Sequence, residues 1–414
     1  MANVAMAPPF GRRAPQLRNG SPTSLSMRRC EVRWGIYPGF KELQWKYLSM
    51  TREKKKRHLR DTKGVWSFIC PIRNLILTKD VGEEVCVEDV IFVASAKLPR
   101  VRKRLGLPVQ ISAFGSHFKK ALAQYETYAV IKTPVGSPKR LKPTLLQKVE
   151  EACCLLRCGS WPFMKRSSAW YLNSFGPPNT SPRTEQHLLF VNRAEKSWVG
   201  ERGWLLGLVP FALDSFWKGF QQEGGFLEDL LAFLAPKSAV QQQWKAQVRQ
   251  AAILLGQSLQ TLDKGIAFLL DMIALDILLL ERTENAEPSM YEPLEALMGW
   301  MNTRLPKPWF TKTAVRRLRT LRNDIVHDGK TTDIKVRDLL LADELAMNLV
   351  MNICLLRKRW GNRSGLIELT EKLKACEALQ LPPSFSRKLR PPTRVIRPQY
   401  KQKDLSDLRG LIGG

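Results

Sequence analysis

An arginine and a histidine five positions apart are the side chains in this sequence best suited to chemistry. They stand in the stretch R-N-D-I-V-H, which begins at Arg322, continues with Asn323 and ends at His327. A guanidinium keeps its charge near neutral pH, whereas an imidazole gains and loses a proton there. Such a pair can neutralise a phosphodiester and move protons around it. RNA cleavage is therefore the leading hypothesis.

The pattern around the motif predicts a helix from Thr313 to Asp328, with Gly329 as a left-handed cap beyond its end. At roughly 100° per residue, one arc of this helix is apolar. The arc holds Val315, Leu318, Leu321, Ile325 and Val326. Arg322 falls inside it, and burying a guanidinium without a partner is costly. We therefore expect Arg322 to face an internal carboxylate or a neighbouring subunit.

The next sector of the same helix is polar and basic. Asn323 and His327 are one turn apart in it and are expected to border solvent. Arg316 and Arg319 share the sector, and we predict that both bind RNA.

A purely structural interpretation of the motif stays open. Arg322 can pair with Asp276 or Glu281 of the preceding predicted helix. His327 can be a polar residue at a helix end, stabilised by the helix dipole.

The chain carries a large positive charge. Its 66 Lys and Arg residues against 38 Asp and Glu residues give a net charge of +28. This excess predicts a polyanionic partner, nucleic acid first and an anionic membrane second. Two basic clusters are predicted to bind RNA: Lys54, Lys55, Lys56 and Arg57, close behind Trp45 and Tyr47, and Arg102, Lys103 and Arg104. For the first cluster, a solvated charged helix is the alternative.

No metal or cofactor site is predicted. The eight cysteines are scattered without a C-x-x-C pair, and there are four histidines, so we expect buried free thiols in a reducing cytoplasm. The long apolar run from Gly265 to Leu280 contains Asp271 and Asp276, which favours a buried helix over a transmembrane segment. The basic, acid-free first thirty residues suit an ordinary tail or a transit peptide.

The N-terminal half is predicted to be of mixed α and β structure, which makes the whole chain an α+β protein. Residues 1–62 are interpreted as a basic arm, and residues 63–235 as an α+β domain that binds substrate or senses a trigger. Strands are expected at Leu75–Leu77, Val85–Val93 and Tyr125–Thr133, and a helix that opens at Pro143. Residues 161–219 are expected to form irregular loops with one strand near residues 188–191.

The C-terminal half is predicted to be helical. Residues 237–362 are expected to form a helical bundle, and residues 363–414 a C-terminal helix followed by a Pro- and Arg-rich tail. The bundle helices are predicted at 241–262, 264–280, 291–302, 313–328 and 333–359.

Residues 240–360 resemble HEPN domains, an all-helical family typified by bacterial defence ribonucleases and toxins. The family hallmark is R-x-x-x-x-H, commonly with a polar residue after the arginine, and here it reads R-N-D-I-V-H. The stretches LRNDIVHDG and IALDILLLE look especially like the ApeA-type branch.

This resemblance implies a metal-independent endoribonuclease that acts as a homodimer, with the two motif helices packed together. His327 would be the general acid or base, Arg322 would neutralise charge on the phosphorane, and Asn323 would orient the phosphate. Attack by the 2′-OH would leave a 2′,3′-cyclic phosphate. The role implied is that of an anti-phage defence or toxin effector, held in check where required by an inhibitory partner protein. Two alternatives remain: a non-catalytic nucleic-acid-binding protein whose helical domain only dimerises, and a membrane- or partner-associated scaffold.

Overall fold

The computed structural model describes residues 67–82, 84–104, 125–132, 134, 138–166, 175–177, 185–192, 197–204, 210–223, 225–261, 263–280, 294, 297, 311–329 and 334–389. All of them belong to the second of two units, residues 62–414. The predicted arm at 1–62, most of the predicted helix at 291–302 and the tail beyond residue 389 lie outside the described residues.

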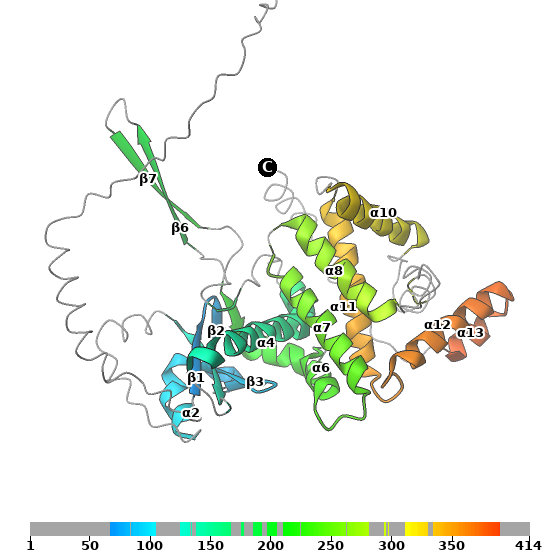
Figure 1. Cartoon of the computed structure of the whole chain (residues 1–414), viewed down its shortest axis with the longest axis horizontal. Helices are drawn as coiled ribbons and strands as arrows, with labels where there is room; N and C mark the ends of the chain where they lie inside the picture. Colours follow the sequence, from blue (N-terminus) through cyan, green and yellow to red (C-terminus); the bar gives the residue numbers. More distant parts are fainter. Residues whose placement is uncertain are drawn as a thin grey trace, which may run out of the picture. The chain divides into compact units, whose positions relative to one another are not determined.

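The described chain combines strands and helices, so the coarse α+β prediction is confirmed (Figure 1). The strands are β1 Ser67–Ile72, β2 Leu75–Leu77, β3 Glu84–Val87, β4 Val90–Ala94, β5 Thr127–Lys132, β6 Glu185–Asn192, β7 Ser197–Trp204 and β8 Phe211–Leu213. The α-helices are α2 Leu98–Arg104, α4 Pro138–Arg166, α5 Ser215–Glu223, α6 Leu227–Leu234, α7 Gln242–Ser258, α8 Lys264–Leu279, α10 Lys312–Asp328, α11 Val336–Leu355, α12 Arg363–Ala378 and α13 Pro383–Leu389. Short 3-10 helices span Lys79–Val81 and Ser95–Lys97.

Four strands form an antiparallel sheet in the order β1-β5-β4-β3. Side chains alternate between its two faces, as the pleat requires. Phe92 and Ala129 belong to the large hydrophobic cluster of the protein, whereas their neighbours Val93, Tyr128 and Val130 pack with α2 on the opposite face. The sheet is therefore covered on both sides.

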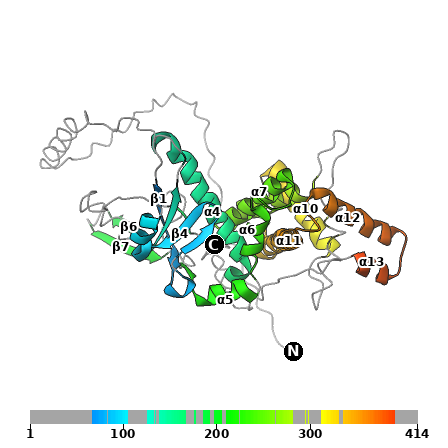
Figure 2. The ribbon, with the colours of Figure 1, turned by 90° about the horizontal axis from the view of Figure 1, so that it is seen from below.

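The long helix α4 links the sheet to the helices. It contacts β1, β3 and β4 and also α5, α6 and α7 (Figure 2). Its predicted apolar stripe is buried as expected: Leu145, Val149, Ala152, Cys153 and Leu156. One hydrophobic cluster includes sheet residues, α4 and residues of α7, α8, α10 and α11. The division of the chain into domains near residue 236 stays a prediction, and hydrophobic residues on both sides of it share this cluster.

Three local predictions were wrong. The segment Val85–Val93 is a hairpin rather than one strand, because Glu88 takes up a left-handed conformation (φ 52) at the turn between β3 and β4. Helix α4 begins at Pro138, not Pro143: Pro138 occupies the first helical position, where the missing N–H has no partner within the helix, and the helix continues through Pro143. The strand expected near residues 188–191 is present as β6, but the stretch 161–219 also contains the end of α4, β7, β8 and the start of α5 in place of irregular loops. Strand pairing through the backbone does not require a clean alternation of apolar residues, so the sequence pattern missed the β6–β7 hairpin.

Candidate functional site on helices α8 and α10

The motif helix α10 is capped at both ends by its own sequence. The Thr311 side chain accepts a hydrogen bond from the backbone N–H of Ala314 at 3.1 Å. At the other end Gly329 is left-handed (φ 66), and its N–H donates to the carbonyl of Ile325 at 3.0 Å. The predicted C-cap is confirmed, and the predicted start of the helix is one residue late. The two caps define where α10 begins and ends, and the motif therefore lies in the last two turns of this helix.

The apolar arc of α10 is buried with one exception. Val315, Leu318, Leu321 and Ile325 belong to the hydrophobic cluster. Val326 is 53% exposed, although the arc includes it. It lies at the edge of the arc, roughly 40° past Arg322. The exposed edge of α10 is therefore partly apolar.

Arg322 faces an internal carboxylate, one of the two arrangements that its place in the apolar arc predicted. Its Nη2 lies 3.5 Å from Oδ2 of Asp276 on α8. Its Nη1 donates a hydrogen bond to Oδ1 of Asn323 at 3.2 Å. The Arg322 side chain is 34% exposed and that of Asp276 is 18% exposed, so the guanidinium is half-buried. Glu281, the other predicted partner, lies outside the described residues.

Burial governs the electrostatics of Asp276. Desolvation raises the pKa of its carboxyl group above the usual value of 3.8, and the attraction of Arg322 opposes this rise without cancelling it. Arg322 therefore lies beside a carboxyl group whose charged form is disfavoured by burial.

The other motif residues border solvent. His327 is exposed in the last turn of α10, and no hydrogen bond or ion pair joins it to another described residue. Arg316 and Arg319 are exposed on the same helix, and Asn323 is half-buried. His327 lies about 7.5 Å along the helix from Arg322 and roughly 140° around it. Arg322 and Asn323 are thus brought together, while His327 lies one turn beyond Asn323 and points well away from Arg322.

An ion pair that the sequence did not predict holds α10 against α11. Arg317 donates Nε to Oδ1 of Asp338 at 2.7 Å and Nη2 to Oδ2 at 2.8 Å. Asp338 is buried in the first turn of α11 and also accepts from the backbone N–H of Lys335 at 3.3 Å. Asp338 is the third residue of α11, where an acidic side chain caps the first turn, but the helix was predicted to start at residue 333 and so did not indicate this role.

The predicted basic clusters lie elsewhere. In α2, Arg104 pairs with Glu84 through both carboxylate oxygens, so part of its charge is already neutralised. Arg102 and Lys103 belong to the same helix, and their side chains lie outside the described residues. The cluster of Lys54, Lys55, Lys56 and Arg57 also lies outside them.

Cysteine burial follows the prediction at five positions: Cys70, Cys153, Cys154, Cys158 and Cys354. Cys86 is exposed on the edge strand β3, contrary to the expectation of buried thiols. Within the described ranges, no group of three or more His, Cys, Asp or Glu side chains could hold a metal ion. No helix in this part of the chain is long and apolar enough to cross a membrane.

Comparison with known proteins gives no match, whether with family models, curated protein sequences or solved structures. The assignment of function therefore depends on the motif and its surroundings.

Proposed function

We propose that this protein is a metal-independent endoribonuclease of HEPN type. The observation that carries the proposal is the contact between Arg322 and Asn323 on a well-capped helix that also presents an exposed His327 one turn beyond Asn323. A half-buried guanidinium retains electrostatic strength that full solvation would weaken. An exposed imidazole at the helix end is accessible to a substrate proton.

In the proposed reaction, His327 removes the proton from the 2′-OH or supplies one to the departing 5′-oxygen. Arg322 stabilises the negative charge that grows on the phosphorane, and Asn323 orients it. The bond from phosphorus to the 5′-oxygen breaks as the bond to the 2′-oxygen forms, which leaves a 2′,3′-cyclic phosphate and a 5′-OH. Arg316 and Arg319 bind the flanking RNA backbone.

The active form is proposed to be a homodimer joined through α8 and α10. Arg322 and His327 diverge by roughly 140° on one helix, so a second copy offers a way to present both groups to one phosphate. Ile266 and Ile273 on α8 and Val326 on α10 are exposed apolar side chains. Such residues suit an interface between copies. The Ile273→Asp variant is expected to be monomeric by light scattering and inactive.

Cleavage of labelled single-stranded RNA in EDTA tests the chemistry. We expect RNA but not the equivalent DNA to be cut, and His327→Ala and Arg322→Ala to lose at least 100-fold in rate while keeping their fold. Arg140→Ala, which removes an exposed arginine of α4, is the matched control and should cleave normally. An anti-phage or toxin role further predicts that the wild-type chain, unlike His327→Ala, arrests the growth of cells that express it.

A second candidate function is a nucleic-acid-binding protein without catalysis. The ion pair with Asp276 favours it, because a guanidinium that already has a carboxylate partner is less available to a phosphate. Tight, salt-dependent RNA binding without cleavage, equal in the wild type and in His327→Ala, would support this candidate.

A further inference from the structure

Asp276 is an unusual residue in its helix. Helix α8 is apolar around most of its circumference, and its sequence K-G-I-A-F-L-L-D-M-I-A-L-D-I-L-L contains only two carboxylates. Asp276 lies in the last turn of the helix, and its side chain is 18% exposed. Its ion pair with Arg322 joins charged side chains of α8 and α10.

The ion pair is a poor explanation for stability alone. Burial disfavours the charged carboxylate more than Arg322 favours it, as the raised pKa of Asp276 indicates. A neutral side chain of the same shape would therefore suit the folded protein better. The carboxylate of Asp276 is better explained by its effect on the orientation of Arg322.

Asp276 and Asn323 together restrict the guanidinium. The carboxylate lies near Nη2 and the amide oxygen accepts from Nη1, so two of the three nitrogen atoms have partners from two helices. Nε–H has no partner among the described residues. Fixing a long, flexible arginine in advance removes the conformational entropy that a phosphate would otherwise have to overcome.

We propose that Asp276 is a positioning residue, which orients Arg322 so that its remaining N–H groups meet the phosphorane. This inference rests on the proposed ribonuclease function. Asp276 touches neither the RNA nor the reacting atoms, and it opposes the binding of a phosphate through its negative charge. Orientation of Arg322 acts on the transition state and affects kcat, whereas repulsion of the RNA phosphate acts on substrate binding and affects KM. Steady-state kinetics therefore distinguish the two effects.

The test is the steady-state cleavage of a short single-stranded RNA by Asp276→Asn, which changes the charge and keeps the shape. We expect kcat to fall at least tenfold, with KM unchanged or lower because a negative charge near the phosphate is gone. A defect that only loosened the fold would raise KM or lower the concentration of active enzyme. Asp276→Glu, which keeps the carboxylate, should recover most of kcat.

A double-mutant comparison tests whether Asp276 acts through Arg322. In an Arg322→Ala background, Asp276→Asn should leave kcat unchanged, since nothing remains to be oriented. Glu371→Gln is the charge-matched control: it removes an exposed carboxylate from α12 and should cleave as the wild type does. Circular dichroism and thermal unfolding of each variant establish that it is folded.

The possible results separate this inference from the proposed function. If the wild type cleaves RNA and Asp276→Asn keeps the same kcat, the positioning role is wrong and the ribonuclease function stands. An additional loss of kcat in the Arg322→Ala background would also overturn it. If the wild type cleaves no RNA, the ribonuclease function fails and the positioning role fails with it.

Discussion

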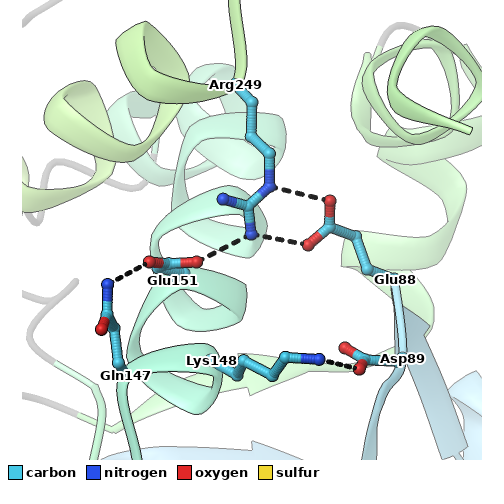
Figure 3. Close-up of polar contacts among 6 residues, drawn as sticks. All are labelled: Glu88, Asp89, Gln147, Lys148, Glu151 and Arg249. Carbon is cyan, nitrogen blue, oxygen red and sulfur yellow. Dashed lines mark hydrogen bonds and ion pairs between the residues drawn. The ribbon is translucent and has the colours of Figure 1, made fainter. Parts of the chain in front are cut away.

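Arg249 on α7 donates two hydrogen bonds to the carboxylate of Glu88, at the turn of the β3–β4 hairpin. Its Nε donates to Oε1 at 3.0 Å and its Nη2 to Oε2 at 2.8 Å (Figure 3). The same Nη2 donates to Glu151 of α4 at 2.8 Å. One guanidinium thus joins the hairpin, α4 and α7, and its partner Glu88 is the left-handed residue of the hairpin turn.

Removal of this guanidinium is expected to loosen the sheet from the helices. The three side chains are 21–30% exposed, so the contacts are partly screened by solvent. We expect Arg249→Met to lower the free energy of unfolding by roughly 1–2 kcal/mol, measured by urea denaturation.

The neighbouring pair is the control for this prediction. Lys148 lies 2.6 Å from Asp89 in the same region, with side chains 44% and 52% exposed (Figure 3). Because such an exposed pair contributes little, Lys148→Met should change the free energy of unfolding by less than about 0.5 kcal/mol. Equal effects of the two substitutions would show that the bidentate contact has no special importance.

A second arginine is expected to contribute more, because it is fully buried. Arg157 of α4 donates Nε to the carbonyl of Gly256 at 2.8 Å, donates Nη1 to the carbonyl of Phe175, and lies 5.1 Å from the centroid of the Phe175 ring. Arg157→Met would leave two buried carbonyl groups without donors. We expect a loss of about 3 kcal/mol or more in the free energy of unfolding, again by urea denaturation.

Arg140→Met is the matched control, since it removes an exposed arginine from the same helix. It should have almost no effect on unfolding. If Arg157→Met were equally harmless, the interior around α4 would have to admit water or rearrange to satisfy both carbonyl groups.

The sequence predicted those features of the fold that depend on local patterns. The caps of α10 and the buried stripes of α4 and α11, the latter with Leu341, Leu345 and Leu349, follow from residue types and spacing alone. The sequence limited the candidate partners of Arg322 to Asp276 and Glu281, because the preceding helix offers few carboxylates.

Contacts between distant segments could not be predicted in this way. Glu88 and Arg249 are separated by 161 positions, and nothing in either local sequence indicates the other. In the sequence, Arg317 resembles a solvent-exposed arginine. Its partner Asp338 is identified only from the packing of α10 against the start of α11. Such pairs depend on how helices and sheet pack together, which periodicity does not encode.

The packing of α7 against α4 leads to a prediction about a glycine. A Cβ added at Gly256 would lie 2.5 Å from the Cα atom of Cys154, which is backbone and cannot rotate away. Alanine is a better helix former than glycine by roughly 1 kcal/mol, yet the overlap would outweigh this gain. We expect Gly256→Ala to lower the free energy of unfolding by about 2 kcal/mol.

Gly219 provides the opposite case within α5. A Cβ there would meet no atom within 4 Å. Gly219→Ala is therefore expected to raise the free energy of unfolding by roughly 0.5–1 kcal/mol. A stabilising Gly256→Ala would indicate that α4 and α7 can move apart at little cost.

The final prediction concerns pH and the carboxylate of Asp276. Because its pKa is raised in the folded protein, the folded state holds this proton more tightly than the unfolded state does. The stabilising effect of the protonated form is complete below the usual pKa of 3.8 and is lost as pH rises through the folded-state pKa. Asp276→Asn should therefore be more stable than the wild type at pH 7, and this advantage should shrink toward pH 4.

Urea denaturation of both proteins between pH 4 and pH 7 measures the difference directly. Removal of Arg322 provides the internal check, because its attraction lowers the pKa of Asp276. In an Arg322→Ala background the carboxylate loses that compensation, so Asp276→Asn should stabilise the protein more at pH 7 than it does with Arg322 present. A wild type more stable than Asp276→Asn at pH 7 would mean that the ion pair contributes more than burial costs. The carboxylate would then have a structural role sufficient to explain its presence.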